Sequence, residues 1–167
     1  MAVQNTLDLK LGKVFAPAGT YKLDSITVDV AYSSLYGENS RTIFDFSTSL
    51  STKCINIIGS VYPPYYQNGN GLFDFQMIGS GASGVQTGLN IDNTSSGASS
   101  HINIERVNIK GFLVGIFYKN NAYLIRHIST DICECGTCLY SDGTGDDYGE
   151  NWSYNGCAFY NSTNILD

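Results

Sequence analysis

The residues most able to do chemistry gather in one acidic stretch near the C-terminus. Asp142, Asp146, Asp147 and Glu150 all fall within residues 141–150, between residues that favour turns. Hydrolysis of a glycosidic bond needs two carboxyl groups, one protonated to assist the leaving group and one ionised as base or nucleophile. Carboxylates crowded in one loop push their pKa values apart, as that division of roles requires. The pattern predicts Glu150 with Asp147 or Asp146 as a catalytic acid and base.

Aromatic residues flank the same stretch. Tyr140, Tyr148 and Trp152 each combine an apolar ring with a polar tip, which suits contact with sugar rings. We therefore expect these three residues to bind substrate. A second interpretation stays open, because Asp and Gly are typical of any exposed turn. On that interpretation Glu150 does no more than hydrogen-bond a neighbouring segment.

The cysteines and histidines give weaker signals. Cys133, Cys135, Cys138 and Cys157 could bind zinc by residue count, but their spacing is not one of the usual zinc pairs. A free cysteine at an inward position behaves as a small hydrophobic residue, so we expect core packing, no metal and no cofactor. The odd total of five does not fit a secreted disulfide framework. The two histidines, at positions 101 and 127, are expected to be ordinary surface or core residues.

The composition around these residues is that of a β-rich protein. The chain has 167 residues, the length of one domain, and only 14% of them are charged, against roughly a quarter in average domains. Ser, Thr, Asn and Gly are abundant, and they disfavour helices, so an all-helical bundle is excluded. Aliphatic and aromatic residues are numerous enough to form a core, which excludes a disordered chain.

Charge and hydropathy limit the partners. The formal net charge is −6, and the nine Lys and Arg residues are scattered, so nucleic acid is not an expected partner. No apolar run approaches the roughly 18 residues of a membrane span, and no signal peptide is visible at the N-terminus. We expect synthesis in a cytosol, reduced thiols and no membrane insertion.

The elements that must position these residues are short strands. Val3–Leu11 has apolar residues every four positions and predicts one or two helical turns. Strands are predicted from alternating or apolar segments at Tyr21–Val30, Arg41–Phe46, Lys53–Ile58 and Phe73–Ile78. Two antiparallel sheets packed as a sandwich are the second architecture that such a pattern allows.

The second half of the chain carries a repeat that favours a solenoid. Ile104–Ile109 matches Ile125–Thr130 at an offset of 21 residues, and that segment matches Tyr154–Phe159 at an offset of 29. In this alignment Cys133 takes the place of Phe112, and Cys157 takes the place of Val107 and Ile128, which are inward positions. A unit of 20 to 30 residues with short strands and variable loops is typical of stacked coils that share one core. About five or six coils are expected.

Three segments resemble a known family. Gly12–Tyr21 matches the G-x-V-x-x-P-x-G-x-Y motif of the pectate-lyase-like right-handed β-helix superfamily, in which a short preceding helix caps the solenoid. Val3–Leu11 occupies that cap position, and Ser100–Phe112 is similar to a typical coil. Gly149–Cys157 resembles a segment common in bacteriophage tailspikes of this superfamily. The resemblance implies an all-β right-handed parallel β-helix forming one domain over residues 1–167. Residues 1–12 are then the capping helix and opening segment, and residues 13–167 are the coils.

Membership implies a function at the tail of a phage particle. Such proteins are homotrimers that bind, and often cleave, a bacterial capsule or lipopolysaccharide, with hydrolysis expected ahead of lyase chemistry. The expected partners are therefore a bacterial surface polysaccharide and, in a full-length protein, two further copies of the chain. Typical tailspikes are longer, so the chain is expected to be part of a longer protein. The alternative is a non-catalytic structural or receptor-binding module of a tail fibre or adhesin, and a free-standing pectate lyase comes third.

Overall fold

The chain is mostly β-structure, and its described strands pair in parallel. The computed structural model describes residues 2–10, 12–60, 70–92, 99–120, 122–143 and 149–167. Within these ranges there is one short α-helix, α1 (Ala2–Asp8), and one 3-10 turn, η1 (Asn39–Arg41). Every strand pair found among the described residues is parallel, which confirms the all-β prediction and excludes the antiparallel sandwich.

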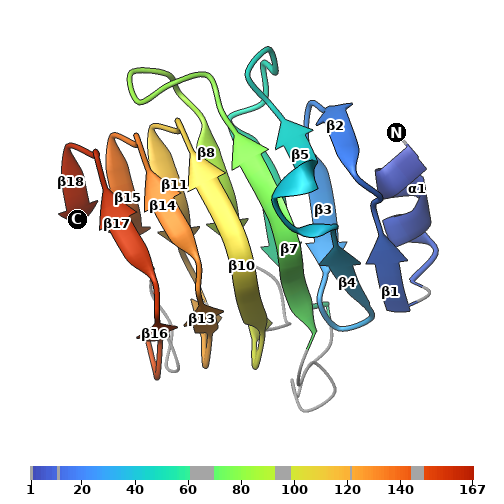
Figure 1. Cartoon of the computed structure of the whole chain (residues 1–167). Coiled ribbons are helices and arrows are strands. Elements are labelled where there is room, and N and C mark those ends of the chain that lie inside the picture. Colours follow the sequence, from blue (N-terminus) through green and yellow to red (C-terminus); the bar gives the residue numbers. More distant parts are fainter. Residues whose placement is uncertain (1, 11, 61–69, 93–98, 121, 144–148) are drawn as a thin grey trace.

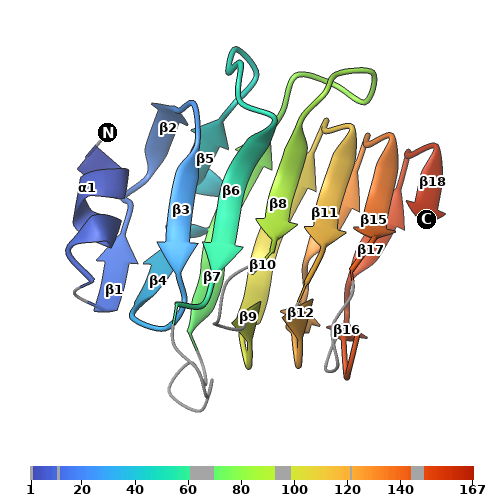
Figure 2. The ribbon, with the colours of Figure 1, turned by 180° about the vertical axis from the view of Figure 1, so that it is seen from behind.

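The strands form two long sheets and one short one (Figures 1 and 2). The ten strands of sheet A are β1 (Gly12–Phe15), β2 (Gly19–Lys22), β4 (Ser33–Tyr36), β5 (Thr42–Asp45), β7 (Gly71–Ile78), β10 (Asn103–Lys110), β13 (Arg126–Ile128), β14 (Asp131–Cys133), β16 (Ser153–Asn155) and β17 (Ala158–Tyr160). The six strands of sheet B are β3 (Ile26–Asp29), β6 (Lys53–Ile58), β8 (Thr87–Ile91), β11 (Val114–Tyr118), β15 (Thr137–Ser141) and β18 (Asn164–Leu166). Sheet C pairs β9 (Ser99–Ser100) with β12 (Ala122–Tyr123).

The chain visits sheet A and then sheet B repeatedly, and each such passage is called a circuit below. Corresponding residues of successive circuits lie side by side, as Ile104, His127 and Tyr154 do in sheet A. These pairings are 23 and 27 residues apart, so the predicted offsets of 21 and 29 were each wrong by two residues. The correct register brings His127 into the core and places Ile128 on the outer face, opposite Glu105. It also pairs Cys133 with Lys110, not with Phe112.

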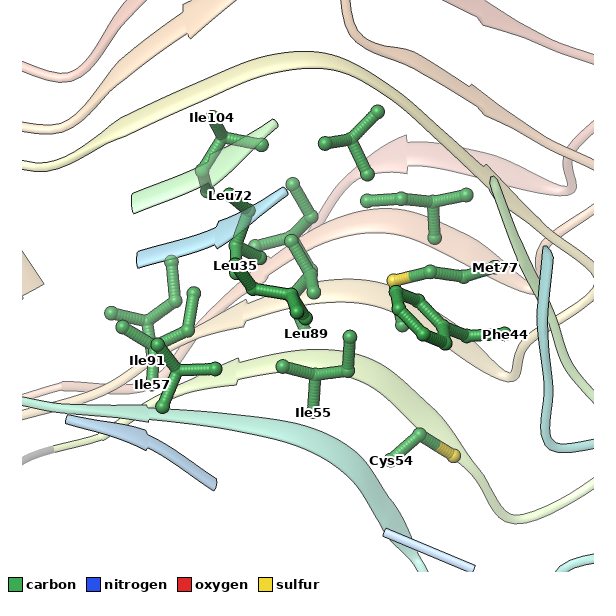
Figure 3. Packing of buried hydrophobic residues seen from close by; sticks show 14 of the residues in the cluster. Leu35, Phe44, Cys54, Ile55, Ile57, Leu72, Met77, Leu89, Ile91 and Ile104 are labelled. Carbon is green, nitrogen blue, oxygen red and sulfur yellow. The ribbon is translucent and has the colours of Figure 1, made fainter. Parts of the chain in front are cut away.

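The register of the circuits stacks apolar side chains into continuous columns. Leu35, Leu72 and Ile104 are consecutive members of one column from sheet A, and each is fully buried (Figure 3). Sheet B supplies a facing column that includes Ile55 and Leu89. Helix α1 lies at one end of the stack, and its Leu7 is buried against the core (Figure 1). This confirms the helical turns predicted within Val3–Leu11. The shared core follows from this alignment, since no single circuit could bury its own inner face.

The chain turns at corners that are also stacked. Three columns of residues with positive φ mark these corners: His101, Leu124 and Asn151; Asp74, Arg106, Ser129 and Gly156; and Gly111, Glu134 and Asn161. The left-handed region favours Gly and tolerates Asn and Asp better than other residues. The corners therefore account for part of the Gly- and Asn-rich composition. They also interrupt the alternation of inward and outward residues, which is why apolar spacing alone gave a register wrong by two.

Candidate functional site

The acidic stretch is only partly described by the structure. Asp146, Asp147 and Tyr148 lie outside the described residues. Glu150 is exposed, and its carbonyl oxygen accepts a hydrogen bond of 2.7 Å from the backbone N–H of Leu124. The segment that carries Glu150 is therefore anchored to the preceding circuit through its backbone.

Two of the aromatic residues predicted to bind substrate face different surroundings. Trp152 lies next to Ile125 of the preceding circuit in a core column. Its ring stacks on Tyr118 at a centroid distance of 4.2 Å. Its indole Nε1–H donates to the carbonyl oxygen of Ala122 at 3.0 Å. Tyr140 is half-buried on sheet B, where its ring contacts Phe117 at a centroid distance of 5.1 Å. The two rings thus belong to different parts of the molecule.

A polar hollow of about 270 Å³ is lined in part by Asn151, the residue that follows Glu150. It is called the polar hollow below, and three successive circuits contribute to it. The residues that line it are His101, Leu124, Arg126, Asn151 and Ser153. Asn151 and Ser153 are exposed, whereas Trp152 between them is partly buried against the core. The alternation that buries Trp152 therefore turns its two neighbours toward the hollow.

The floor of the polar hollow is a hydrogen-bonded ladder. Arg126 pairs with Ser153 in the parallel register of β13 and β16. The backbone N–H of Arg126 donates to Ile102 at 3.0 Å, and that of Ser153 donates to Ile125 at 3.0 Å. Neighbouring strands in such a ladder are about 4.8 Å apart. The side chains of the hollow are therefore held at fixed spacing by the main chain.

The arginines of the chain differ in their partners. Arg41 forms an ion pair with Glu38, and Arg106 contacts Asp74 through both Nε (2.6 Å) and Nη2 (2.9 Å). The guanidinium of Arg126, by contrast, is exposed and contacts no carboxylate within the described ranges. An arginine with this freedom can offer its planar set of N–H donors to a ligand.

The other polar groups of the hollow are donors or can act as donors. The Nδ1 of His101 lies 3.2 Å from Ser100 Oγ, and its ring meets the Tyr123 ring edge-on at 6.5 Å. These contacts orient the imidazole and leave Nε2 as the nitrogen that a ligand can reach. Asn151 and Ser153 add an amide and a hydroxyl. A few convergent polar groups beside an apolar surface, here Leu124, are typical of ligand sites.

A larger hollow of about 590 Å³ adjoins the last circuit. Leu139, Trp152, Tyr154 and Leu166 supply most of its apolar surface. These residues belong to the inward-facing columns, so the hollow lies on the inner side of the sheets. Its lining also includes Ser141, Asn151 and Asp167, but no arginine or histidine, which is why we regard the smaller hollow as the candidate site.

Sequence reasoning missed a cluster of polar groups in the core. The hydroxyl of Tyr118 lies 2.7 Å from Nε2 of His127 and 2.8 Å from the hydroxyl of Tyr154. The rings of His127 and Tyr154 stack at 4.7 Å. These three residues are called the interior cluster below. The correct repeat offset would have revealed it, since that offset places His127 in the column of Ile104.

Burial controls the protonation of the interior cluster. It lowers the pKa of His127 to about 3, because the charged ring would lose its hydration. It raises the pKa of Tyr154 to about 12 and that of Tyr118 well above its ordinary value, in both cases chiefly through desolvation. His127 is therefore neutral near pH 7. Its Nδ1 is buried and has no hydrogen-bond partner among the described residues.

The cysteines are free thiols, and four of them are buried. Cys135 and Cys138 belong to the core, and Cys157 is half-buried. Within the described part of the chain, no group of three or more His, Cys, Asp or Glu side chains is placed to hold a metal ion. The same residues include no helix long and apolar enough to cross a membrane.

Comparison with known proteins adds no family assignment. No protein-family model matches the chain, and a search of curated proteins finds no match. The functional argument therefore rests on the geometry of the polar hollow and on the residues around it.

Proposed function

We propose that the chain is a right-handed parallel β-helix of the pectate-lyase-like superfamily that binds a bacterial surface polysaccharide, as part of a phage tailspike. The parallel, in-register stacking of the circuits supports this architecture. The family-like motif also supports it. The Tyr21 hydroxyl donates to the Pro17 carbonyl at 3.0 Å, and the Tyr21 ring lies 5.7 Å from Phe44, so the motif closes the first turn onto the core.

The polar hollow is the observation that carries the binding proposal. Its volume of about 270 Å³ is near the lower end of ligand pockets, which begin at roughly 300 Å³. Such a space suits one sugar residue of a longer chain. Arg126, Asn151 and Ser153 can donate to sugar hydroxyls, while Leu124 can contact the C–H groups of a ring. The virion tail as location and a trimer in a full-length protein belong to the same proposal.

Cleavage of the bound polysaccharide is a second candidate function. Glu150 favours it, because this exposed residue directly precedes Asn151, which lines the polar hollow. Asp146 or Asp147 would then supply the second carboxyl group that glycoside hydrolysis needs. Without such a pair the chain is a binding module, which holds the polysaccharide and leaves it intact.

Binding and cleavage can be separated in one experiment. The chain is mixed with a panel of purified capsular polysaccharides and lipopolysaccharide O-chains, and calorimetry and new reducing ends are measured together. We expect at least one glycan to bind. Failure of all glycans to bind would overturn the proposed function.

Two carboxylate variants then decide on cleavage. If the bound glycan is cut, we expect Glu150→Gln to abolish cleavage and to retain binding, with Glu134→Gln as the matched control. Glu134 is exposed on another corner, 3.1 Å from Lys110, so its loss should leave both measurements unchanged. Unchanged cleavage by the Glu150→Gln protein would remove this residue from the mechanism. Binding without any reducing ends would identify a binding module.

A further inference from the structure

The described side chains that line the polar hollow carry a positive charge within an acidic protein. Among these described residues, His101, Leu124, Arg126, Asn151 and Ser153, there is no carboxylate, although the formal net charge of the chain is −6. A concave region of one charge sign raises the local concentration of oppositely charged ligand groups. This local charge is not explained by binding of a neutral sugar, which needs hydrogen bonds alone.

The carboxylate on the strand paired with that of Arg126 is already neutralised. Glu105 lies on β10 beside the strand of Arg126, and its Oε2 is 3.2 Å from Nη1 of Arg106. Arg106 also holds Asp74. Glu105 and Asp74 are thus both directed to Arg106, and Arg126 contacts neither of them.

The backbone holds Arg126 in place for a ligand. Its main chain is fixed by the ladder to Ile102 and Ser153, so only the side chain must order when a ligand binds. Charge-assisted hydrogen bonds from a guanidinium to a carboxylate or phosphate are roughly twice as strong as neutral ones, and they are frequently bidentate. Nε2 of His101 and the donors of Asn151 and Ser153 can complete the shell around the same anion.

We infer that the polar hollow recognises a negatively charged substituent of the polysaccharide, a carboxylate or a phosphate, with Arg126 as the residue that determines specificity. The inference rests on the proposed function, because it names the chemical class of the glycan that the hollow takes. His101 is the second residue that contacts the anion, and Leu124 contacts the sugar ring that carries it.

The test compares acidic glycans with their neutralised forms. Each polysaccharide that binds in the panel is carboxyl-reduced in one arm and dephosphorylated in another, and its affinity is measured again by calorimetry. We expect the bound glycan to be acidic. One of the two treatments should lower its affinity by about tenfold to a hundredfold, as loss of a charge-assisted hydrogen bond implies. The treatment that weakens binding identifies the carboxylate or the phosphate as the source.

Arginine variants show whether the anion lies in the polar hollow. Arg126→Gln should cause a similar loss for the untreated glycan and no loss for the neutralised one. Arg126→Lys should recover part of the affinity, because an ammonium keeps the charge without the planar fork. Arg106→Gln removes the same charge from an arginine that is already paired, so it should leave affinity unchanged. Thermal unfolding of each variant checks that the fold is intact.

The outcomes separate this inference from the proposed function. A bound glycan that is neutral, or whose neutralised form binds equally well, overturns the anion site and leaves polysaccharide binding established. An equal loss in the Arg106→Gln and Arg126→Gln proteins also overturns it, because general electrostatic attraction would then account for the effect. Absence of binding by every glycan overturns both proposals.

Discussion

The interior of the molecule changes character between its early and its late circuits. In the early circuits the columns are aliphatic, as with Leu35, Leu72 and Ile104. In the last two circuits the same column continues with His127 and Tyr154. A facing column from sheet B changes where Tyr118 follows Ile91, in the circuit of Ile104 that directly precedes His127. The two columns become polar within one circuit of each other.

The coincidence has a physical reason. A buried polar group is costly unless it is hydrogen-bonded, and a single polar residue in an aliphatic column would have no partner. Tyr118 comes from sheet B, whereas His127 and Tyr154 come from sheet A, and its hydroxyl serves both. Trp152 covers the cluster by stacking on Tyr118. A stacked core therefore accepts polar groups as a set contributed by two sheets.

The largest expected effect lies in the aliphatic circuits. Leu72→Ala removes a fully buried side chain between Leu35 and Ile104 and leaves a cavity. We expect a loss of about 2–5 kcal/mol in the free energy of unfolding, measured by chemical denaturation. Val85→Ala, at a position that is 66% exposed, is the control and should change stability by less than about 0.5 kcal/mol. Equal effects in the two variants would contradict the assignment of Leu72 to the shared core.

Acid should destabilise the polar circuits specifically. The pKa of His127 is about 3 in the folded chain, against 6.5 ordinarily, so between these values the unfolded chain binds a proton that the folded chain does not. Stability is therefore lost as pH falls from 6.5 toward 3, by up to about 1.4 kcal/mol per pH unit. The measurement is the unfolding free energy between pH 7 and pH 5, above the range in which most carboxylates titrate.

The control for this pH dependence is His127→Leu. Leucine has a similar size and does not titrate, so the variant should lose the additional acid sensitivity. At pH 7 its stability should lie close to that of the parent chain, because the substitution also removes the buried, unpaired Nδ1. An identical pH profile in the two proteins would show that His127 does not carry the effect.

A smaller effect is expected from the central hydroxyl. Tyr118→Phe keeps the ring that stacks on Trp152 and removes the bonds to His127 and Tyr154. Buried partners left without a hydrogen bond cost about 1–3 kcal/mol. Tyr140→Phe, on the half-buried outer side of sheet B, is the matched control and should be nearly neutral. If the Tyr118→Phe chain were as stable as the control, the interior cluster would contribute nothing to stability.

Much of this architecture could be predicted from composition and spacing. The scarcity of helix formers predicted a β-protein, and the segments at Lys53–Ile58 and Phe73–Ile78 lie within or coincide with the strands β6 and β7. Strand β4 was missed, because Ser33 and Ser34 are small polar residues that do not alternate with apolar ones. Both are nevertheless buried, and Ser34 donates to Asn70, a residue 36 positions away. Such a strand is stabilised by contacts that no local pattern records.

The candidate site was harder to predict than the fold. Sequence spacing drew attention to Glu150 and Trp152, and the polar hollow indeed contains Asn151 between them. His101 and Arg126 could be placed there only with the correct register of the circuits. The positive φ values at Arg106 and Ser129 interrupt the alternation of side chains, so apolar spacing fitted a wrong offset equally well. A small error in register therefore hid both the hollow and the interior cluster.

The smallest effect concerns the polar edge of Trp152. Trp152→Phe keeps an aromatic ring against Tyr118 and removes the Nε1–H bond to Ala122. One neutral hydrogen bond contributes about 0.5–1.5 kcal/mol, and the ring is only partly buried, so the loss should lie at the low end of that range. Trp152→Ala removes the stacking as well and should cost clearly more, which calorimetric unfolding can resolve.

Since Asn151 and Ser153 are positioned by the same segment, glycan affinity should fall in the alanine variant and persist in the phenylalanine one. Loss of affinity in both would instead place the indole ring itself in contact with the sugar.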